Sequence, residues 1–194
     1  MKRFLAVFLS VMLVLGVAGC RDKAQDDARS AFEKLMTAIC DVDMEKAGKY
    51  LDTGSLTGVS VDDLDGADAV IEAVFSKLEW EIVSCTASDN DEAVLAAKLT
   101  TIDLTAVLEQ CTKIVMDEYA NGTLLDEELE SRTDEVFREE IAKSDLPKIT
   151  NEIDITVKRF EDGWKVEMSD ELRDAVSAGF LGQIEKAKQS MQNF

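Results

Sequence analysis

Alternation of apolar and polar residues on both sides of an Asp-Gly pair constrains the fold of this chain more than any other feature. Within residues 148–160, the alternating set is Ile149, Asn151, Ile153, Ile155 and Val157, in which only Asn151 is polar. The Asp-Gly pair follows at residues 162–163, and the alternation resumes at residues 164–168. An Asp-Gly pair between two alternating runs is typical of a tight β-hairpin turn. The apolar residues expected on the inward side of this hairpin are Ile153, Ile155, Val157, Trp164 and Val166. The stretch therefore predicts an antiparallel sheet with one apolar face.

A second hairpin is predicted in the middle of the chain. Residues 79–86 and 93–102 alternate in the same way and flank the turn sequence Ser-Asp-Asn-Asp at residues 88–91. The apolar residues expected to face inward from these strands are Trp80, Ile82, Leu95, Ala97 and Leu99. Lys98 and Thr100 fall on the opposite side. Both hairpins thus offer an apolar face to a common core.

Apolar residues at helical spacing predict helices before, between and after the hairpins. They fall in residues 28–40, in a short helix capped by Asp43, in residues 69–77, in a pair within residues 103–144, and in residues 169–184 with Ser169 as the cap. Helices combined with antiparallel hairpins predict an α+β fold. The roughly 175 residues that follow the first 19 suit a single domain with a sizeable core.

The helical pair of residues 103–144 is inserted between the two hairpins. Its first helix ends near Asn121 and Gly122, its second begins at Asp126, and Pro147 ends the region. The buried stripe of the first helix is expected to hold Leu104, Val107, Leu108, Cys111, Ile114 and Val115. The second helix has a narrower apolar stripe, formed by Leu129, Val136, Phe137 and Ile141. We therefore expect the second helix to be largely solvated.

The first twenty residues have the pattern of a secretion signal. Lys2 and Arg3 precede a nearly unbroken apolar run over residues 4–14. This run is short of the roughly 20 residues that a membrane-spanning helix requires, so it is interpreted as the apolar region of a signal peptide. The chain is accordingly expected to be exported.

The end of this signal, Val17-Ala18-Gly19-Cys20, resembles the bacterial lipobox, in which the cysteine is lipid-modified and becomes the mature N-terminus. By that resemblance, residues 1–19 are a lipoprotein signal peptide, residues 20–27 are a lipidated tether, and residues 28–194 are one domain. Acyl chains on Cys20 would hold the domain on the extracytoplasmic face of the cell membrane. The alternative is an ordinary signal peptide in which a cysteine falls at this position by chance.

The charge of the chain restricts its partners. It has 40 acidic and 21 basic residues and no histidine, which gives a formal charge of −19. Such a surface repels nucleic acid and anionic lipid head groups, so binding to either polyanion is disfavoured. Two interpretations remain open, a solvated acidic surface and attraction for a cationic partner.

The remaining cysteines, Cys40, Cys85 and Cys111, are an odd number and lack Cys-x-x-Cys spacing. Either two of them pair and one is left over, or all three are buried thiols that behave as small apolar residues; we favour the second. A dense group of acids, Asp62, Asp63, Asp65 and Asp68, lacks the order of a calcium loop. The start of a helix explains these acids better, and neither a metal nor a cofactor is predicted.

The order of elements and the strand Asp162-Gly163-Trp164-Lys165-Val166 together resemble the NTF2-like or cystatin-like α+β plan, in which a curved antiparallel sheet wraps N-terminal helices. With the lipobox, the chain is most similar to small lipoproteins of Gram-positive bacteria that carry NTF2-like domains of unknown function, of the DUF5105 and DUF4878 type. It departs from that plan at residues 103–144, where simple members have a short connection. The insertion could cover a pocket mouth or form a surface for a partner.

Enzymes of this superfamily place a carboxylate base inside the cone of the sheet, often with a histidine or tyrosine, whereas every inward position assigned here is apolar. We therefore expect a non-catalytic binding or interaction domain, which would expose an apolar patch on residues 103–144. The alternative is a carrier of a small apolar ligand in an open cone. The residues predicted to line that pocket are Trp80, Ile82, Leu95, Leu99, Ile155, Val157 and Trp164. An enzyme would instead require a carboxylate such as Asp103 or Glu81 in a cleft beside a tyrosine.

Overall fold

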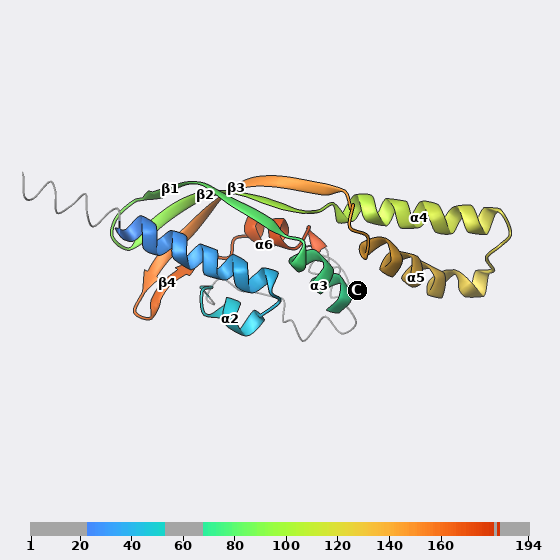
Figure 1. Cartoon of the computed structure of the whole chain (residues 1–194), viewed down its shortest axis with the longest axis horizontal. Coiled ribbons are helices and arrows are strands. Elements are labelled where there is room, and N and C mark those ends of the chain that lie inside the picture. Colours follow the sequence, from blue (N-terminus) through green and yellow to red (C-terminus); the bar gives the residue numbers. More distant parts are fainter. Residues whose placement is uncertain (1–22, 53–67, 181, 183–194) are drawn as a thin grey trace, which may run out of the picture.

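The computed structural model describes residues 23–52, 68–180 and 182, and within them the chain has an α+β fold, as predicted. Four antiparallel strands form one sheet in the order β1-β2-β3-β4 (Figure 1). The strands are β1 (Glu79–Ala87), β2 (Glu92–Ile102), β3 (Lys148–Phe160) and β4 (Gly163–Val166). Both predicted hairpins are confirmed, because β1 pairs with β2 and β3 pairs with β4.

The two hairpins join into one sheet through β2 and β3. Their register runs from Glu92 opposite Lys158 to Ile102 opposite Lys148, over eleven residue pairs. Because Ile102 and Lys148 are partners, the segment between them leaves the sheet and returns to it at neighbouring positions. The inserted helices therefore project from one end of the sheet, where α4 and α5 extend beyond the strands (Figure 1).

A β-bulge in β1 changes which residues face the core. The register with β2 shifts between Ile82 and Ser84, and Val83 is exposed at the shift. Beyond it, Cys85 and Ala87 face inward in place of the next residues of the original alternation. Bulges bend the strand that carries them and increase its twist, which fits the curvature of the sheet over the N-terminal helix in Figure 1.

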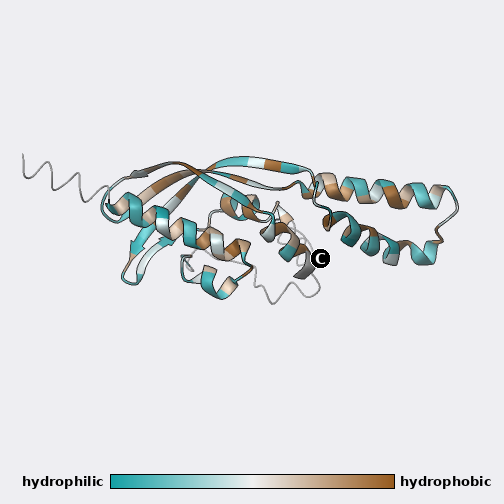
Figure 2. Cartoon of the chain, in the orientation of Figure 1, coloured by the Kyte–Doolittle hydropathy of each residue, from teal (hydrophilic) through white to brown (hydrophobic). Residues whose placement is uncertain are grey.

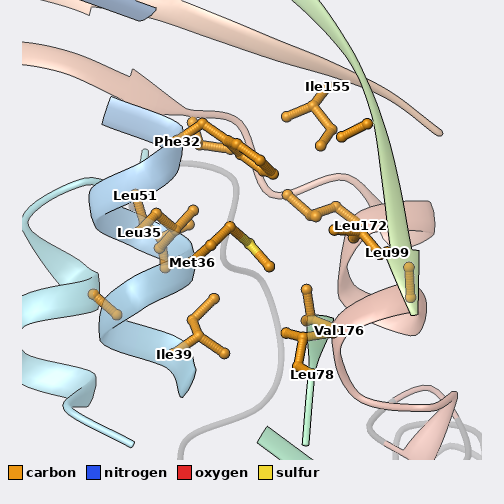
Figure 3. Close-up of a cluster of buried hydrophobic side chains, with 14 of the residues drawn as sticks. Phe32, Leu35, Met36, Ile39, Leu51, Leu78, Leu99, Ile155, Leu172 and Val176 are labelled. Carbon is orange, nitrogen blue, oxygen red and sulfur yellow. The ribbon is translucent and has the colours of Figure 1, made fainter. Parts of the chain in front are cut away.

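A helix over residues 23–40 packs against the sheet and α6 and supplies the centre of the core. Phe32, Leu35 and Met36 are fully buried, and Figure 3 shows them facing Leu99, Ile155 and Leu172 across the interior. The helix begins earlier than predicted. Residues 23–27, expected to belong to the tether, are already helical, because Ala24 is buried against the core.

The other helices are α2 (Met44–Gly48), α3 (Asp68–Ser76), α4 (Leu104–Ala120), the short 3-10 helix η3 (Asp126–Glu128), α5 (Leu129–Ile141) and α6 (Asp170–Val176). The predicted caps at Asp43 and Ser169 are present. The Asp43 carboxylate accepts a hydrogen bond from the Lys46 amide, and the Ser169 hydroxyl accepts one from the Leu172 amide. Each side chain satisfies an amide that the first helical turn leaves unpaired.

The last predicted helix, residues 169–184, is interrupted. α6 ends at Val176, and both Ala178 (φ 54°) and Gly179 (φ 75°) adopt left-handed backbone conformations. The Gly179 amide donates to the Asp174 carbonyl at 2.8 Å, which closes the helix end. Leu181 and Ile184 from the same prediction lie outside the described residues, as do Cys20, Asp62, Asp63 and Asp65. Among the described residues, no helix combines the length and the apolar composition needed to span a membrane.

Candidate functional site

Four of the residues predicted to line a ligand pocket lie in the hydrophobic core. Leu95, Leu99, Ile155 and Val157 are each at most 1% exposed. A void large enough for water would expose part of the side chains around it. These four side chains therefore pack against neighbours and do not face an open cone, which removes the structural basis for an apolar carrier at this place.

The other predicted pocket residues, Trp80, Ile82 and Trp164, are partly buried and pack against the same core. The ring of Trp80 meets Phe32 edge to face, with centroids 5.8 Å apart and planes at 83°. This geometry is favourable for an aromatic pair within a core. Plain packing thus accounts for the environment of Trp80.

A cleft of about 620 Å³ lies near the point where the inserted helices leave the sheet. Its walls come from the end of β2, the start of α4, the first half of β3 and α6, and none of the seven predicted pocket residues lines it. The lining residues are Ile102, Asp103, Leu104, Thr105, Ile149, Thr150, Asn151, Glu152, Ile153, Glu171, Asp174, Ala175, Ala178 and Gly179. The sequence did not indicate this cleft, because its walls come from elements far apart along the chain.

The two carboxylates singled out for an enzyme occupy different positions. Asp103 lines the cleft, where its carboxylate accepts a hydrogen bond from the Ala106 amide at 3.0 Å and caps α4. Glu81 is exposed on β1 and does not line the cleft. The described residues around the cleft include no tyrosine, so the cleft lacks the carboxylate beside a tyrosine that the enzyme hypothesis requires.

The inserted helices α4 and α5 form an arm, residues 103–144, with a small core of its own. That core consists of Val107, Cys111, Val115, Leu124 and Val136, with Ile114, Leu129, Phe137 and Leu146 packed against it. Phe137 and Leu146 also contact the main core. The arm is therefore packed internally and is continuous with the body at its base.

Ion pairs hold the two helices of the arm together. The Arg132 guanidinium on α5 donates two hydrogen bonds of 2.8 Å to the Glu118 carboxylate on α4, and a third of 2.8 Å to Glu135. Arg132 lowers the pKa of Glu118 through these hydrogen bonds and through its charge. Because a bidentate Arg–carboxylate pair fixes geometry as well as charge, it restricts how the two helices can move past each other.

A single lysine ties the base of the arm to the body. The Lys77 ammonium, just beyond α3, donates to the Ile141 carbonyl at 2.9 Å and to the Lys143 carbonyl at 2.8 Å. These carbonyls lie at the C-terminal end of α5, where backbone oxygens lack helical partners and attract cations. Lys77 thereby caps α5 and fixes the arm to the domain.

The outward face of α4 carries an exposed apolar stripe. Leu108, Met116 and Tyr119 are between 43% and 54% exposed, and their spacing of eight and three residues places them on one side of the helix. Leu125, at the tip of the arm, is 58% exposed. We call Leu108, Met116 and Tyr119 the α4 stripe. In Figure 2, apolar positions recur along α4, whereas α5 is mostly hydrophilic.

The exposure of Leu108 corrects the sequence analysis, which placed it on the buried stripe of α4. The buried residues of this helix are Leu104, Val107, Cys111 and Val115. Leu108 lies at the margin of that set and turns to solvent, because α5 covers only one side of α4. Met116 and Tyr119 extend the same exposed side, and their spacing from Leu108 was the sequence signal that could have identified it.

The three cysteines in the described part of the chain are unpaired thiols, as favoured, but only Cys111 is fully buried, whereas Cys40 and Cys85 are partly exposed. Burial raises the pKa of all three thiols. Cys111 lies within the core of the arm, and the Cys40 thiol donates to the Leu78 carbonyl at 3.4 Å. Thiols held in their neutral form by burial are poor nucleophiles and poor metal ligands. In the same described residues, no group of three or more acidic or cysteine side chains is placed to hold a metal ion.

No protein-family model and no curated protein matches this chain. Among solved structures, the chain is similar to ycdA of Bacillus subtilis subsp. subtilis str. 168, a protein assigned as a lipoprotein. The two share 16% sequence identity with a TM-score of 0.49, over 81% of this chain and 56% of the other. The chain thus spans just over half the length of that structure. A similarity of this size assigns no activity to the chain described here.

Proposed function

We propose that this chain is an extracytoplasmic lipoprotein of the NTF2-like or cystatin-like kind, anchored through a lipid on Cys20, that acts as a non-catalytic protein-interaction domain. The α4 stripe is its proposed contact surface. One observation carries this proposal. Of the seven large apolar side chains that are exposed among the described residues, four lie on the arm, and three of these, Leu108, Met116 and Tyr119, form the α4 stripe.

The stripe is unusual because the arm does not need it for its own packing. The arm already has a buried core on the adjacent side of α4. Exposed apolar residues gathered on one surface, as opposed to scattered singly, are typical of interaction sites. Covering them would gain roughly 25 cal/mol for each Å² of apolar surface removed from water.

The internal ion pairs favour binding on this surface. A partner that meets a rigid platform loses less conformational entropy than one that must order a mobile segment. The Glu118–Arg132 pair fixes α4 against α5, and the Lys77 cap fixes α5 to the body before any partner arrives. The arm is therefore preorganised for contact along α4.

The charge of the arm favours a cationic partner. Residues 103–144 include twelve acidic and four basic side chains. Such a surface is repelled by anionic lipid head groups, so the stripe is unsuited to insertion into an anionic bilayer. It attracts a protein surface that combines apolar and basic groups, and we expect the encounter to weaken as salt is added.

Site-specific photocrosslinking in the native host tests this proposal. A photoreactive side chain at Thr112, within the surface of the stripe, should give one discrete adduct with a protein. The same group at Glu130, exposed on α5, serves as the matched control. The substitution Met116→Asp should abolish the Thr112 adduct while leaving the arm folded. Equal adducts from Thr112 and Glu130, or an adduct that survives Met116→Asp, would contradict the stripe as the contact surface.

A further inference from the structure

The outer edge of β3 is only partly covered. β4 pairs with β3 over residues 157–160. In the described ranges, no strand pairs with that edge between residues 148 and 155. An open edge presents backbone donors and acceptors that can pair with another extended chain.

The direction of these backbone groups follows from one hydrogen bond. The Glu167 amide, just beyond β4, donates to the Thr156 carbonyl at 2.9 Å, so the backbone groups of Thr156 point to the outer edge. Because the direction alternates along a strand, the amides and carbonyls of Asp154, Glu152 and Thr150 point the same way. The Arg159 amide, an odd-numbered position, donates instead to the Asp91 carbonyl on the β2 side, which fits this alternation.

The cleft of about 620 Å³ runs along this same open segment. Five consecutive residues of β3, from Ile149 to Ile153, line it, and α6 forms the facing wall. Residues that point to opposite faces of a strand can both line a cleft only if it lies at the strand edge. The open hydrogen-bonding groups and the cleft therefore form one continuous feature.

The charged residues that line the cleft are all acidic. Four of the lining residues are acidic, namely Asp103, Glu152, Glu171 and Asp174, and none is lysine or arginine. Apolar surface lies between them, contributed by Ile149, Ile153 and Ala178. A bound chain would therefore find acceptors for basic side chains along an apolar floor.

We propose that this cleft binds an extended peptide segment with lysine or arginine at alternate positions, which pairs with the outer edge of β3 as an additional strand. Its backbone would exchange hydrogen bonds with Thr150, Glu152 and Asp154. Its basic side chains would face the carboxylates of Glu171 and Asp174. A second copy of this chain is a poor occupant, because edge-to-edge pairing would set Glu152 and Asp154 of the two copies against each other. This site is separate from the α4 stripe.

Hydrogen exchange on the full-length lipoprotein in detergent tests this proposal at about 0.15 M salt, where exposed charges are well screened. The probe is a blocked peptide of alternating lysine and valine, and the control is a peptide of equal charge in which each lysine is followed by two prolines. The lysine–valine peptide should slow exchange of the backbone amides in residues 148–156. The lysine–proline peptide should not, because prolines at two of every three positions remove amide donors from both edges of the peptide.

Two variants separate the charge from the strand pairing. Glu171→Gln removes an exposed carboxylate from the α6 wall and should weaken binding of the lysine–valine peptide by about two- to fivefold. Glu152→Pro removes an outward amide without touching the ladder to β2, a position where an edge strand tolerates proline, and should abolish protection of residues 148–156. Met116→Asp in the α4 stripe should change neither result.

Equal affinity for the two peptides without protection of residues 148–156 would reduce the effect to diffuse attraction between charges and overturn the proposal. Protection confined to α4 and α5 would overturn it as well. Because Met116→Asp affects only the stripe, failure of this site and failure of the interaction surface on the arm are distinguishable.

Discussion

Val42 ends the N-terminal helix in a conformation that its branched side chain disfavours. Its φ is 58°, its amide donates to the Ile39 carbonyl, and the Asp43 amide donates to the Ala38 carbonyl, each at 2.9 Å. This pattern is a Schellman motif, in which the left-handed position is usually glycine. A β-branched residue at positive φ is a genuine outlier. The backbone at Val42 is therefore strained.

Glycine at this position should relieve the strain. Because both Val42→Gly and Val42→Ala remove the branched side chain, their difference isolates the backbone. We expect the free energy of unfolding of Val42→Gly to exceed that of Val42→Ala by about 1 kcal/mol. Urea denaturation measures both values. An alanine variant as stable as the glycine variant would show that the left-handed conformation carries no strain.

The loss of stability caused by truncating Leu99 distinguishes a filled cone from an open one. Leu99 is fully buried, so Leu99→Ala should lower the free energy of unfolding by about 2–5 kcal/mol through lost contacts and a residual cavity. The control is Ile149→Ala, at a side chain that is 44% exposed, where the loss should stay below about 1 kcal/mol. Thermal or urea unfolding gives both numbers. Equal and small losses would mean that Leu99 faces open space and would favour the carrier hypothesis.

At the scale of elements, the arm depends on how α4 ends. Gly122 has φ 71°, its amide donates to the Tyr119 carbonyl at 3.0 Å, and the Thr123 amide donates to the Glu118 carbonyl at 3.1 Å. A Cβ at Gly122 would meet no atom within 4 Å. Any cost of a substitution there is therefore conformational and not steric.

Gly122→Ala should lower the free energy of unfolding by about 1 kcal/mol, because only the backbone conformation opposes alanine. Gly48→Ala is the matched control. Gly48 lies within α2, also with nothing within 4 Å of a Cβ, but without a positive φ. There alanine should be neutral or stabilising by up to about 1 kcal/mol. Denaturation of both variants checks the sign, and a loss at both positions would contradict the argument.

The Glu118–Arg132 pair makes the junction between α4 and α5 sensitive to acid. Because Arg132 lowers the pKa of Glu118 in the folded arm, the pair stabilises the fold at pH values above the unfolded pKa of glutamate, about 4.3. That contribution is lost as the pH falls through the lower, folded pKa. Arg132→Gln should return the pKa of Glu118 to its usual range, measured by the carboxyl ¹³C shift during a pH titration. An unchanged pKa in that variant would show that Arg132 is not the cause.

The sequence predicted the helices and strands better than the tertiary contacts around them. The strand bounds and the inward set, such as Leu95 and Ile155, followed from a period of two, which a sheet with one buried face imposes. The early start of the N-terminal helix could not be predicted, because residues 21–27 are mostly polar and only tertiary contact buries Ala24. The same apolar alternation is compatible with a packed core and with an open cone. The sequence therefore could not show that Leu99 is buried, and the structure was needed to establish it.

At the scale of the whole molecule, the proposed attachment to the membrane requires a lipid on Cys20. Cys20→Ala should block lipid transfer and release the protein from the membrane fraction, while inhibition of the lipoprotein signal peptidase should make the uncleaved precursor of the natural chain accumulate. Fractionation and an immunoblot against the domain measure both effects. A Cys20→Ala protein that stays on the membrane with its signal intact, together with a natural chain that never carries lipid, would contradict the anchor.

The position of the arm has a consequence for reach. The described N-terminal helix begins at one end of the molecule and the arm projects from the other (Figure 1). The 17 residues of α4 alone span about 25 Å at the rise of an α-helix. Under the proposed anchor at Cys20, the arm would be the part of the domain that extends away from the attached end. Lengthening or shortening α4 and α5 together by whole turns would therefore move the contact point outward or inward without altering the sheet that supports it.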